Sequence, residues 1–109
     1  MNKSKQIYTL DEIKQIASSV FSQYPTIQSA YLFGSYARCE ATPNSDLDFL
    51  IQLVDDEFIT LKKSFIVDVD LEDAFHKQVD VLTNRDLLKL RSKNIEREMI
   101  LIYESLSDE

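Results

Sequence analysis

The sequence predicts an α/β (α+β) domain, in which a small mixed β-sheet is flanked by helices and residues 1–109 form one unit. Segments with apolar residues at helical spacing are interspersed with short segments in which apolar and polar residues alternate, as in strands. A chain of 109 residues is long enough for one hydrophobic core and too short for two. No repeat, low-complexity stretch or linker divides it.

The N-terminal part predicts a helix, a strand and a second, short helix. Thr9-Leu10-Asp11-Glu12 has the form of a capping box, and apolar residues then recur at helical spacing to about Ser22. Pro25 ends this helix because it cannot continue the backbone hydrogen bonding. The apolar run Ser29 to Phe33 predicts a short buried strand, and Ser35 to about Ala41 a short helix.

The middle of the chain predicts a turn and an amphipathic strand. Thr42-Pro43-Asn44-Ser45 is a turn by composition. From Asp46 to Leu53 apolar and polar residues alternate, so that Asp46 and Asp48 share one face and the apolar side chains face the core. The apolar face consists of Leu47, Phe49, Ile51 and Leu53.

The second half is less regular. Asp55-Asp56-Glu57 is a favourable helix start, and helical spacing continues over residues 58–75. Residues 65–71 also alternate as a strand would, so both possibilities stay open there. The remaining segments are predicted as a strand at 78–83, helical segments at 86–90 and 95–99, and an apolar end at 100–103.

Composition and charge limit the classes of partner. The net charge of −7 argues against direct binding of nucleic acid, whose phosphates require a positive surface. No apolar stretch approaches the roughly 20 residues of a membrane helix, and no secretory signal is visible. The lone Cys39 fits a reducing compartment, so we expect a cytoplasmic protein. A small ligand carrying its own Mg²⁺, or a basic protein partner, is compatible with this charge.

Gly34 is the only glycine, where a chain of this length would on average carry roughly eight. It follows the apolar run that ends at Phe33 and directly precedes Ser35. A glycine kept between a strand and the next element indicates a close approach of the backbone or a positive φ.

Three aspartates are candidate ligands for a cation. Asp46 and Asp48 lie roughly 6.5 Å apart along one strand face, and Asp80 stands between Val79 and Val81 in the third strand. Carboxylate oxygens suit Mg²⁺, and two such ions can hold the attacking and leaving oxygens of a displacement at phosphorus.

Each acidic feature also has a simpler interpretation. A single Asp-x-Asp pair is more often a solvent-exposed face, and Asp68 with Asp70 is interpreted in that way. Asp80 alone would suit an edge strand that resists aggregation. The glycine-serine pair at the end of one strand, the two acids on the next and the third acid on the one after together favour a metal-dependent nucleotide site.

These residues resemble the signature of the DNA polymerase β-like nucleotidyltransferase superfamily. The signature comprises Gly34-Ser35, ten further residues and Asp46-Leu47-Asp48. Its surroundings, Phe33 to Arg38, Ser45 to Asp48 and Val79-Asp80-Val81, are similar to the minimal nucleotidyltransferases, which are stand-alone domains of this length. The family usually has glycine where this chain has Cys39, and a non-glycine residue at positive φ costs about 1 kcal/mol.

The resemblance implies a polymerase β-like fold and the transfer of a nucleoside monophosphate, with release of pyrophosphate. It implies that Gly34 and Ser35 hold the phosphates of a nucleoside triphosphate, and that Arg38 and Ser45 belong to the same nucleotide-binding site. Arg38 could equally pair with Glu40 or another surface acid. The catalytic and metal-binding residues implied are Asp46, Asp48 and Asp80, with two Mg²⁺ ions as cofactors.

The resemblance also implies the acceptor. Minimal nucleotidyltransferases of this type resemble antitoxins that adenylylate (AMPylate) a tyrosine of a HEPN-type ribonuclease toxin with ATP, in a hetero-oligomer with that toxin. Two alternatives stay open. The chain could be a binding antitoxin or regulatory subunit with a vestigial site, or the nucleotide-binding subunit of a two-chain small-molecule nucleotidyltransferase.

Overall fold

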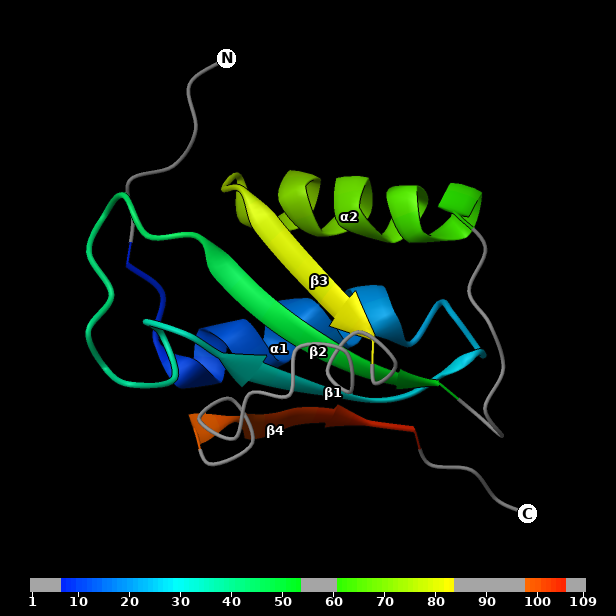
Figure 1. The fold of residues 1–109 in the computed structure, drawn as a ribbon, viewed down its shortest axis with the longest axis horizontal. Helices are drawn as coiled ribbons and strands as arrows, with labels where there is room; N and C mark the ends of the chain where they lie inside the picture. Colours follow the sequence, from blue (N-terminus) through cyan, green and yellow to red (C-terminus); the bar gives the residue numbers. More distant parts are fainter. Residues whose placement is uncertain (1–6, 54–60, 84–97, 106–109) are drawn as a thin grey trace.

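The computed structural model describes residues 7–53, 61–83 and 98–105, and within them two helices accompany a four-stranded mixed sheet (Figure 1). The elements are α1 (Leu10–Phe21), β1 (Ile27–Phe33), β2 (Leu47–Leu53), α2 (Leu61–Phe75), β3 (Val79–Thr83) and β4 (Ile100–Glu104). The strand order is β3-β2-β1-β4. Strand β1 is antiparallel to β2 and β4, whereas β2 and β3 are parallel. The predicted fold class is confirmed.

Helix α1 begins where its capping box predicts. The backbone N–H of Glu12 donates to Thr9 Oγ1 at 3.1 Å, and the N–H of Thr9 donates to Glu12 Oε1 at 2.8 Å. These two bonds satisfy N–H groups that the first helical turn otherwise leaves free. The helix ends at Phe21, one residue before the predicted end.

Aromatic side chains join both helices to one face of the sheet. Phe21 of α1 contacts Phe49 of β2 edge to face, with ring centroids 5.6 Å apart. Phe49 in turn contacts Phe75 of α2 at 5.9 Å. All three rings are fully buried. Because successive strand residues face opposite sides, Asp48 is directed to the face of β2 opposite this core.

Helix α2 settles the ambiguity of residues 65–71, which are helical. Its buried residues Val67, Leu71 and Phe75 recur every four positions, while Phe65 and Val69 are exposed. The strand-like alternation arose because apolar residues also lie on the solvent side of the helix. The predicted start at 55–57 lies outside the described residues. No helix in the described ranges has the length and apolar character needed to cross a bilayer.

The C-terminal apolar run is a strand, which the sequence analysis did not predict. Residues Ile100–Glu104 form β4 and pair with β1, with Ala30 opposite Tyr103. Ile102 is buried in the core, whereas Leu101 is exposed. The predicted helical segment at 86–90 and most of that at 95–99 lie outside the described residues. The β-branched and aromatic content of 100–103 was the available signal for a strand.

Candidate active site

Three strand ends bring the glycine and two of the acids together at one end of the sheet. Antiparallel pairing places Phe33, the last residue of β1, opposite Asp48 near the start of β2. Parallel pairing places Asp48 opposite Asp80 near the start of β3. Gly34 follows Phe33 directly, so it arrives beside the same carboxylates. The register therefore gathers residues that are up to 46 positions apart in the sequence.

Asp48 is the electrostatic centre of this group. Its pKa is raised from 3.8 to about 6, by burial first and then by the charges of Asp80 and Asp46, against a lowering by Arg38. A hydrogen bond between Asp48 and Asp80 contributes to the same shift. A hydrogen bond between two carboxyl groups requires a proton on one of them. Below about pH 6 Asp48 therefore keeps a proton beside Asp80, and at higher pH a bound cation would offset the repulsion between the two carboxylates.

Gly34 meets both requirements that the sequence suggested for it. Its φ is +78°, in the region that side chains disfavour. A Cβ added to it would lie 3.1 Å from Cγ of Asp48 and in impossible contact with Oδ2. The missing side chain is thus the space that the Asp48 carboxylate occupies, and the interpretation of the lone glycine is confirmed.

The donor set fits Mg²⁺. Asp48 and Asp80 offer hard oxygen atoms in mutual contact, and the exposed Asp80 lies on an edge strand where solvent relieves its charge. Asp46 stands one residue before β2 and acts on Asp48 through its charge. Within the described ranges, no three Asp, Glu, His or Cys side chains are gathered closely enough to form a metal cluster. Three-fold ligation therefore requires Asp46 to approach the other two.

The segment after Gly34 makes a single helical turn, so the predicted helix from Ser35 to Ala41 is wrong. Cys39 has φ 61°, the left-handed conformation that ends a helix. Its neighbours show the bonding of a helix C-terminus: Cys39 N–H to Tyr36 O at 3.3 Å, Glu40 N–H to Ser35 O at 2.9 Å and Arg38 N–H to Gly34 O at 3.1 Å. No further helical turn follows because the chain adopts the left-handed conformation at Cys39.

We expect Cys39→Gly to stabilise the protein by about 0.5–1 kcal/mol, because glycine adopts positive φ without the Cβ penalty. For a domain of this size that gain raises Tm by roughly 2–8 °C. Thermal and urea unfolding measure it. Cys39→Ala is the matched control, since it removes the exposed thiol and keeps the Cβ. An equal gain in Cys39→Ala would show that the thiol, and not the backbone, is responsible.

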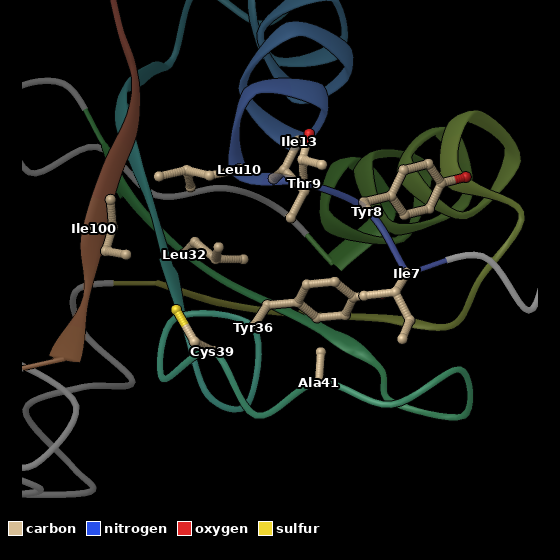
Figure 2. Close-up of a pocket in the computed structure, with 10 residues that line it drawn as sticks. All are labelled: Ile7, Tyr8, Thr9, Leu10, Ile13, Leu32, Tyr36, Cys39, Ala41 and Ile100. Atoms are coloured by element: carbon tan, nitrogen blue, oxygen red, sulfur yellow. The ribbon is translucent and has the colours of Figure 1, made fainter.

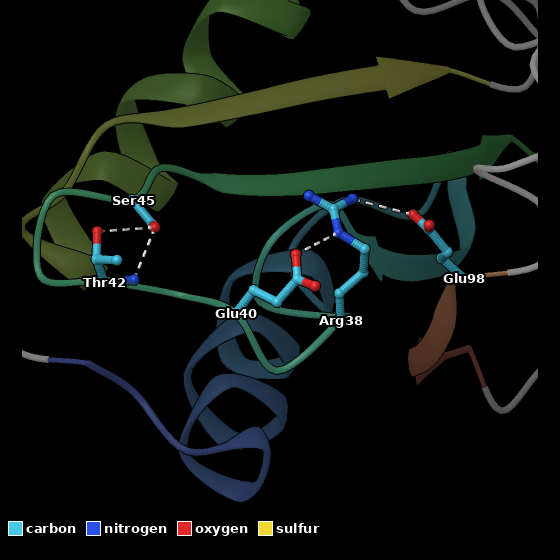
Figure 3. Close-up of polar contacts among 5 residues, drawn as sticks. All are labelled: Arg38, Glu40, Thr42, Ser45 and Glu98. Atoms are coloured by element: carbon cyan, nitrogen blue, oxygen red, sulfur yellow. Dashed lines mark hydrogen bonds and ion pairs between the residues drawn. The ribbon is translucent and has the colours of Figure 1, made fainter.

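Arg38 and Ser45 are already engaged by neighbouring side chains and backbone (Figure 3). Arg38 Nε lies 3.0 Å from Glu40 Oε1 and Nη1 lies 3.1 Å from Glu98 Oε1, as the pairing alternative predicted. Ser45 Oγ accepts from Thr42 N–H at 2.8 Å within the turn before β2. The contribution of Arg38 to the pKa of Asp48 shows that its charge acts on the site despite these pairs.

The second acidic pair is not the freely solvated face that the sequence suggested. Asp70 accepts a hydrogen bond from the hydroxyl of Tyr24, and burial and then this contact raise the pKa of Tyr24 to about 12. Asp68 Oδ1 is buried without a hydrogen-bond partner among the described residues. Burial and then the charges of Glu72 and Asp80 raise the pKa of Asp68. Both acids lie on α2, where partial burial replaces the exposure expected of an isolated pair.

Lys77 lies near the site and is buried, although the sequence pattern does not mark it as a site residue. It follows the C-terminus of α2, and only 4% of its surface is exposed. Its Nζ donates to the backbone carbonyl of Pro43 at 2.8 Å. A lysine just before a strand carries no pattern that distinguishes it from a surface charge, so only the structure could reveal it.

An apolar cavity of about 260 Å³ lies between the start of α1 and the turn that carries Cys39 (Figure 2). Tyr8, Leu32 and Tyr36 are among its lining residues, and none of the three candidate aspartates lines it. Burial raises the pKa of Tyr36, as expected for a phenol in such surroundings. The cavity is therefore separate from the acidic site, and no lysine or arginine that could neutralise a phosphate lines it.

The metal-free protein should lose stability as the pH rises. The folded-state pKa of Asp48, about 6, exceeds its ordinary value of 3.8, so the folded protein binds this proton more tightly than the unfolded chain. The stabilisation is complete below about pH 4 and disappears as the pH passes 6. We expect a loss on the order of 1 kcal/mol between pH 5 and pH 8 in EDTA, measured by urea unfolding. Asp48→Asn should remove most of this slope, and an unchanged slope would contradict the assignment.

The family model for polymerase beta nucleotidyltransferases matches residues 14–108. A Methanocaldococcus jannaschii protein named “putative protein adenylyltransferase” is 35% identical over 98 residues, covering 86% of this chain and 98% of that protein. A solved structure described as a “putative minimal nucleotidyltransferase” is 28% identical, with a TM-score of 0.65, and covers 85% of this chain and 95% of its own.

Two solved toxin–antitoxin structures share the fold. One, described as a toxin–antitoxin with AMP-PNP, has a TM-score of 0.73 at 18% identity, covering 85% of this chain and 74% of that chain. The other is a tri-AMPylated HEPN toxin with an MNT antitoxin from Shewanella oneidensis. Its TM-score is 0.60 at 16% identity, covering 84% of this chain and 73% of that chain.

Proposed function

The chain belongs to the polymerase β nucleotidyltransferase family, and on this basis we propose that it is an Mg²⁺-dependent protein adenylyltransferase acting as an antitoxin. In this proposal it transfers AMP from ATP to a tyrosine hydroxyl of a HEPN-type ribonuclease toxin in the cytoplasm. The relatives named as protein adenylyltransferases and the fold shared with toxin–antitoxin structures support it.

The observation that carries the proposal is the contact between Asp48 and Asp80 beside the backbone of Gly34. Burial and the charge of Asp80 help to raise the pKa of Asp48 to about 6, and a divalent cation held by both carboxylates would offset this repulsion. The strand register and the absent Cβ at Gly34 hold this pair in place.

The turn after Gly34 offers donors for the phosphates. Among the described residues, the backbone N–H groups of Ser35, Tyr36 and Ala37 have no hydrogen-bond acceptor, whereas the next three N–H groups are bonded within the turn. Successive free N–H groups form a concave anion site. We assign the β- and γ-phosphates to this turn, with the Ser35 hydroxyl as an added donor.

Arg38 and Ser45 are proposed as further nucleotide contacts, and each must exchange a partner to serve. Arg38 would release Glu40 or Glu98 and turn its guanidinium to a phosphate oxygen. Ser45 would give up its bond with Thr42. Each exchange replaces an exposed interaction that contributes little free energy with a charge-assisted hydrogen bond to phosphate.

Asp46, Asp48 and Asp80 would hold Mg²⁺, which supplies charge neutralisation at the α-phosphate and at the leaving pyrophosphate. Asp80 would accept the proton of the acceptor hydroxyl, for which its exposure on the edge strand gives access. A bond then forms between the tyrosine oxygen and the α-phosphorus, and the bond from that phosphorus to pyrophosphate breaks. The products are AMP-tyrosine and pyrophosphate.

The acceptor is proposed to be a separate protein. The solved structures that share its fold include toxin–antitoxin structures, and the net charge of −7 would attract a basic partner. Association with such a partner should be rapid at low ionic strength and weaken with salt.

The test is incubation of the purified protein with ATP labelled on the α-phosphate, Mg²⁺ and the product of the neighbouring gene. Mass spectrometry then locates any adenylyl group. We expect label on a partner tyrosine, and far slower labelling with the Asp48→Asn protein. Neutralisation of the partner by Asp48→Asn without label would instead favour a binding antitoxin. Labelling of a small hydroxyl compound without any partner would favour a subunit of a small-molecule transferase.

Ser35→Ala should weaken nucleotide binding or turnover roughly 10–100-fold without abolishing transfer. This is the effect of one hydrogen bond to a charged group, about 1.5–3 kcal/mol. Initial rates over a range of ATP concentrations measure it. Detection of a nucleotide covalently bound to Ser35 would contradict this supporting role, because it would make the serine a nucleophile.

A further inference from the structure

Lys77 is an unusual residue to find inside this small domain. Lysine is among the side chains least often fully buried, yet here 4% of the surface is exposed. Its one hydrogen bond within the described ranges is to the carbonyl of Pro43, at 2.8 Å, and no described carboxylate forms an ion pair with it. Burial of an ammonium group costs free energy that an apolar side chain of similar length would not cost.

The carbonyl that Lys77 binds belongs to the turn leading to the acids. Residues 42–45 form this turn, in which Ser45 N–H donates to Thr42 O at 2.9 Å. Asp46 follows immediately, and the next residue, Leu47, donates its N–H to Gln78 O at 3.1 Å. Lys77 and Gln78 therefore hold the chain on both sides of Asp46.

Side-chain alternation separates Lys77 from the acids themselves. Val79 is buried in the core, and Asp80 is exposed on the other face of β3. Lys77, two residues before Val79, shares the buried side. Its ammonium is therefore buried on the core side and contacts the 42–45 turn at the carbonyl of Pro43.

We propose that Lys77 is a positioning residue that fixes the 42–45 turn so that Asp46 can join Asp48 and Asp80 around a cation. The effect on catalysis rests on the proposed function. The effect on the position of the turn rests on the buried hydrogen bond to Pro43 alone. It accounts for a buried charge in a core where an apolar residue would suffice for packing. It also accounts for Asp46, which stands outside β2 and must be held by its turn instead of by strand pairing.

The test replaces Lys77 with methionine, which keeps the length and apolar stem and removes the ammonium. Lys14→Met on the exposed surface of α1 is the matched control. We expect Lys77→Met to raise the Mg²⁺ concentration for half-maximal transfer 10–100-fold, with high Mg²⁺ restoring kcat. Lys77→Gln, which keeps a shorter donor, should fall between Lys77→Met and wild type. Lys14→Met should match wild type.

Hydrogen exchange gives a second readout that needs no activity. Amides of residues 42–48 should exchange faster in Lys77→Met, and more Mg²⁺ should be needed to slow them, while the α1 amides are unchanged. Unchanged exchange in 42–48 would overturn the inference. So would an equal loss of transfer at every Mg²⁺ concentration together with a lower Tm, which is the mark of a packing role. If wild type transfers no AMP but shows the Mg²⁺-dependent exchange, the function fails and the role of Lys77 stands.

Discussion

Asp48→Asn is expected to reduce Mg²⁺-dependent transfer on the order of 10²–10³-fold while leaving the fold intact. The substitution removes the carboxylate that contacts Asp80 and lies against Gly34. It also removes a charge whose burial and repulsion already raise its pKa to about 6, so the metal-free variant should be more stable than wild type at neutral pH. Transfer rates and unfolding in EDTA measure the two effects separately.

Asp70→Asn is the matched control for that experiment. Asp70 is an aspartate of the same chain, but it lies on α2 and accepts a hydrogen bond from Tyr24. We expect its replacement to lower stability modestly and to leave transfer near the wild-type rate. An active Asp48→Asn protein beside an inactive Asp70→Asn protein would show that the wrong acids were assigned to the site.

Gly34→Ala is expected to abolish transfer and to destabilise the protein by about 1–3 kcal/mol. The new methyl group would be strained at φ +78° and would occupy the position of the Asp48 carboxylate. Since backbone turns shift less readily than a side chain, Asp48 should be displaced from Asp80. Urea unfolding and transfer rates measure the outcome.

A double-mutant cycle separates the two causes of this loss. In an Asp48→Ala background the methyl group no longer meets a carboxylate, so Gly34→Ala should cost less stability than in wild type. The remaining cost reports the strain at positive φ alone. Equal costs in both backgrounds would mean that the contact with Asp48 has no energetic consequence.

Local chemistry made much of the fold predictable. The capping box at Thr9 and the alternation of β2 depend on neighbours in the sequence, so their patterns specified the elements to within a residue. Gly34 was informative because a single glycine between a strand and a serine has few reasons to exist. The presence of one glycine in the whole chain indicated a close approach to the backbone at this position, and the contact with Asp48 is that approach.

Features that depend on distant partners were not predictable. Strand β4 forms because it pairs with the edge of β1. No turn residues mark the beginning and end of Ile100–Glu104, so its bounds as a strand could not be predicted. The segment after Gly34 ends in a single turn because Cys39 adopts positive φ, which the glycine usual at this position in the family indicated and the cysteine itself did not. The roles of Asp70 and Lys77 arise from Tyr24 and Pro43, which lie 46 and 34 residues away.

The most direct test of the central claim is the position of a bound cation and nucleotide. Crystals grown with Mn²⁺ and a non-hydrolysable ATP analogue would locate the metal by its anomalous scattering. We predict Mn²⁺ bound to carboxylate oxygens of both Asp48 and Asp80, with the phosphates on the backbone N–H groups of Ser35, Tyr36 and Ala37. Mn²⁺ bound away from this pair, or an analogue seated in the cavity beside Cys39, would contradict the account.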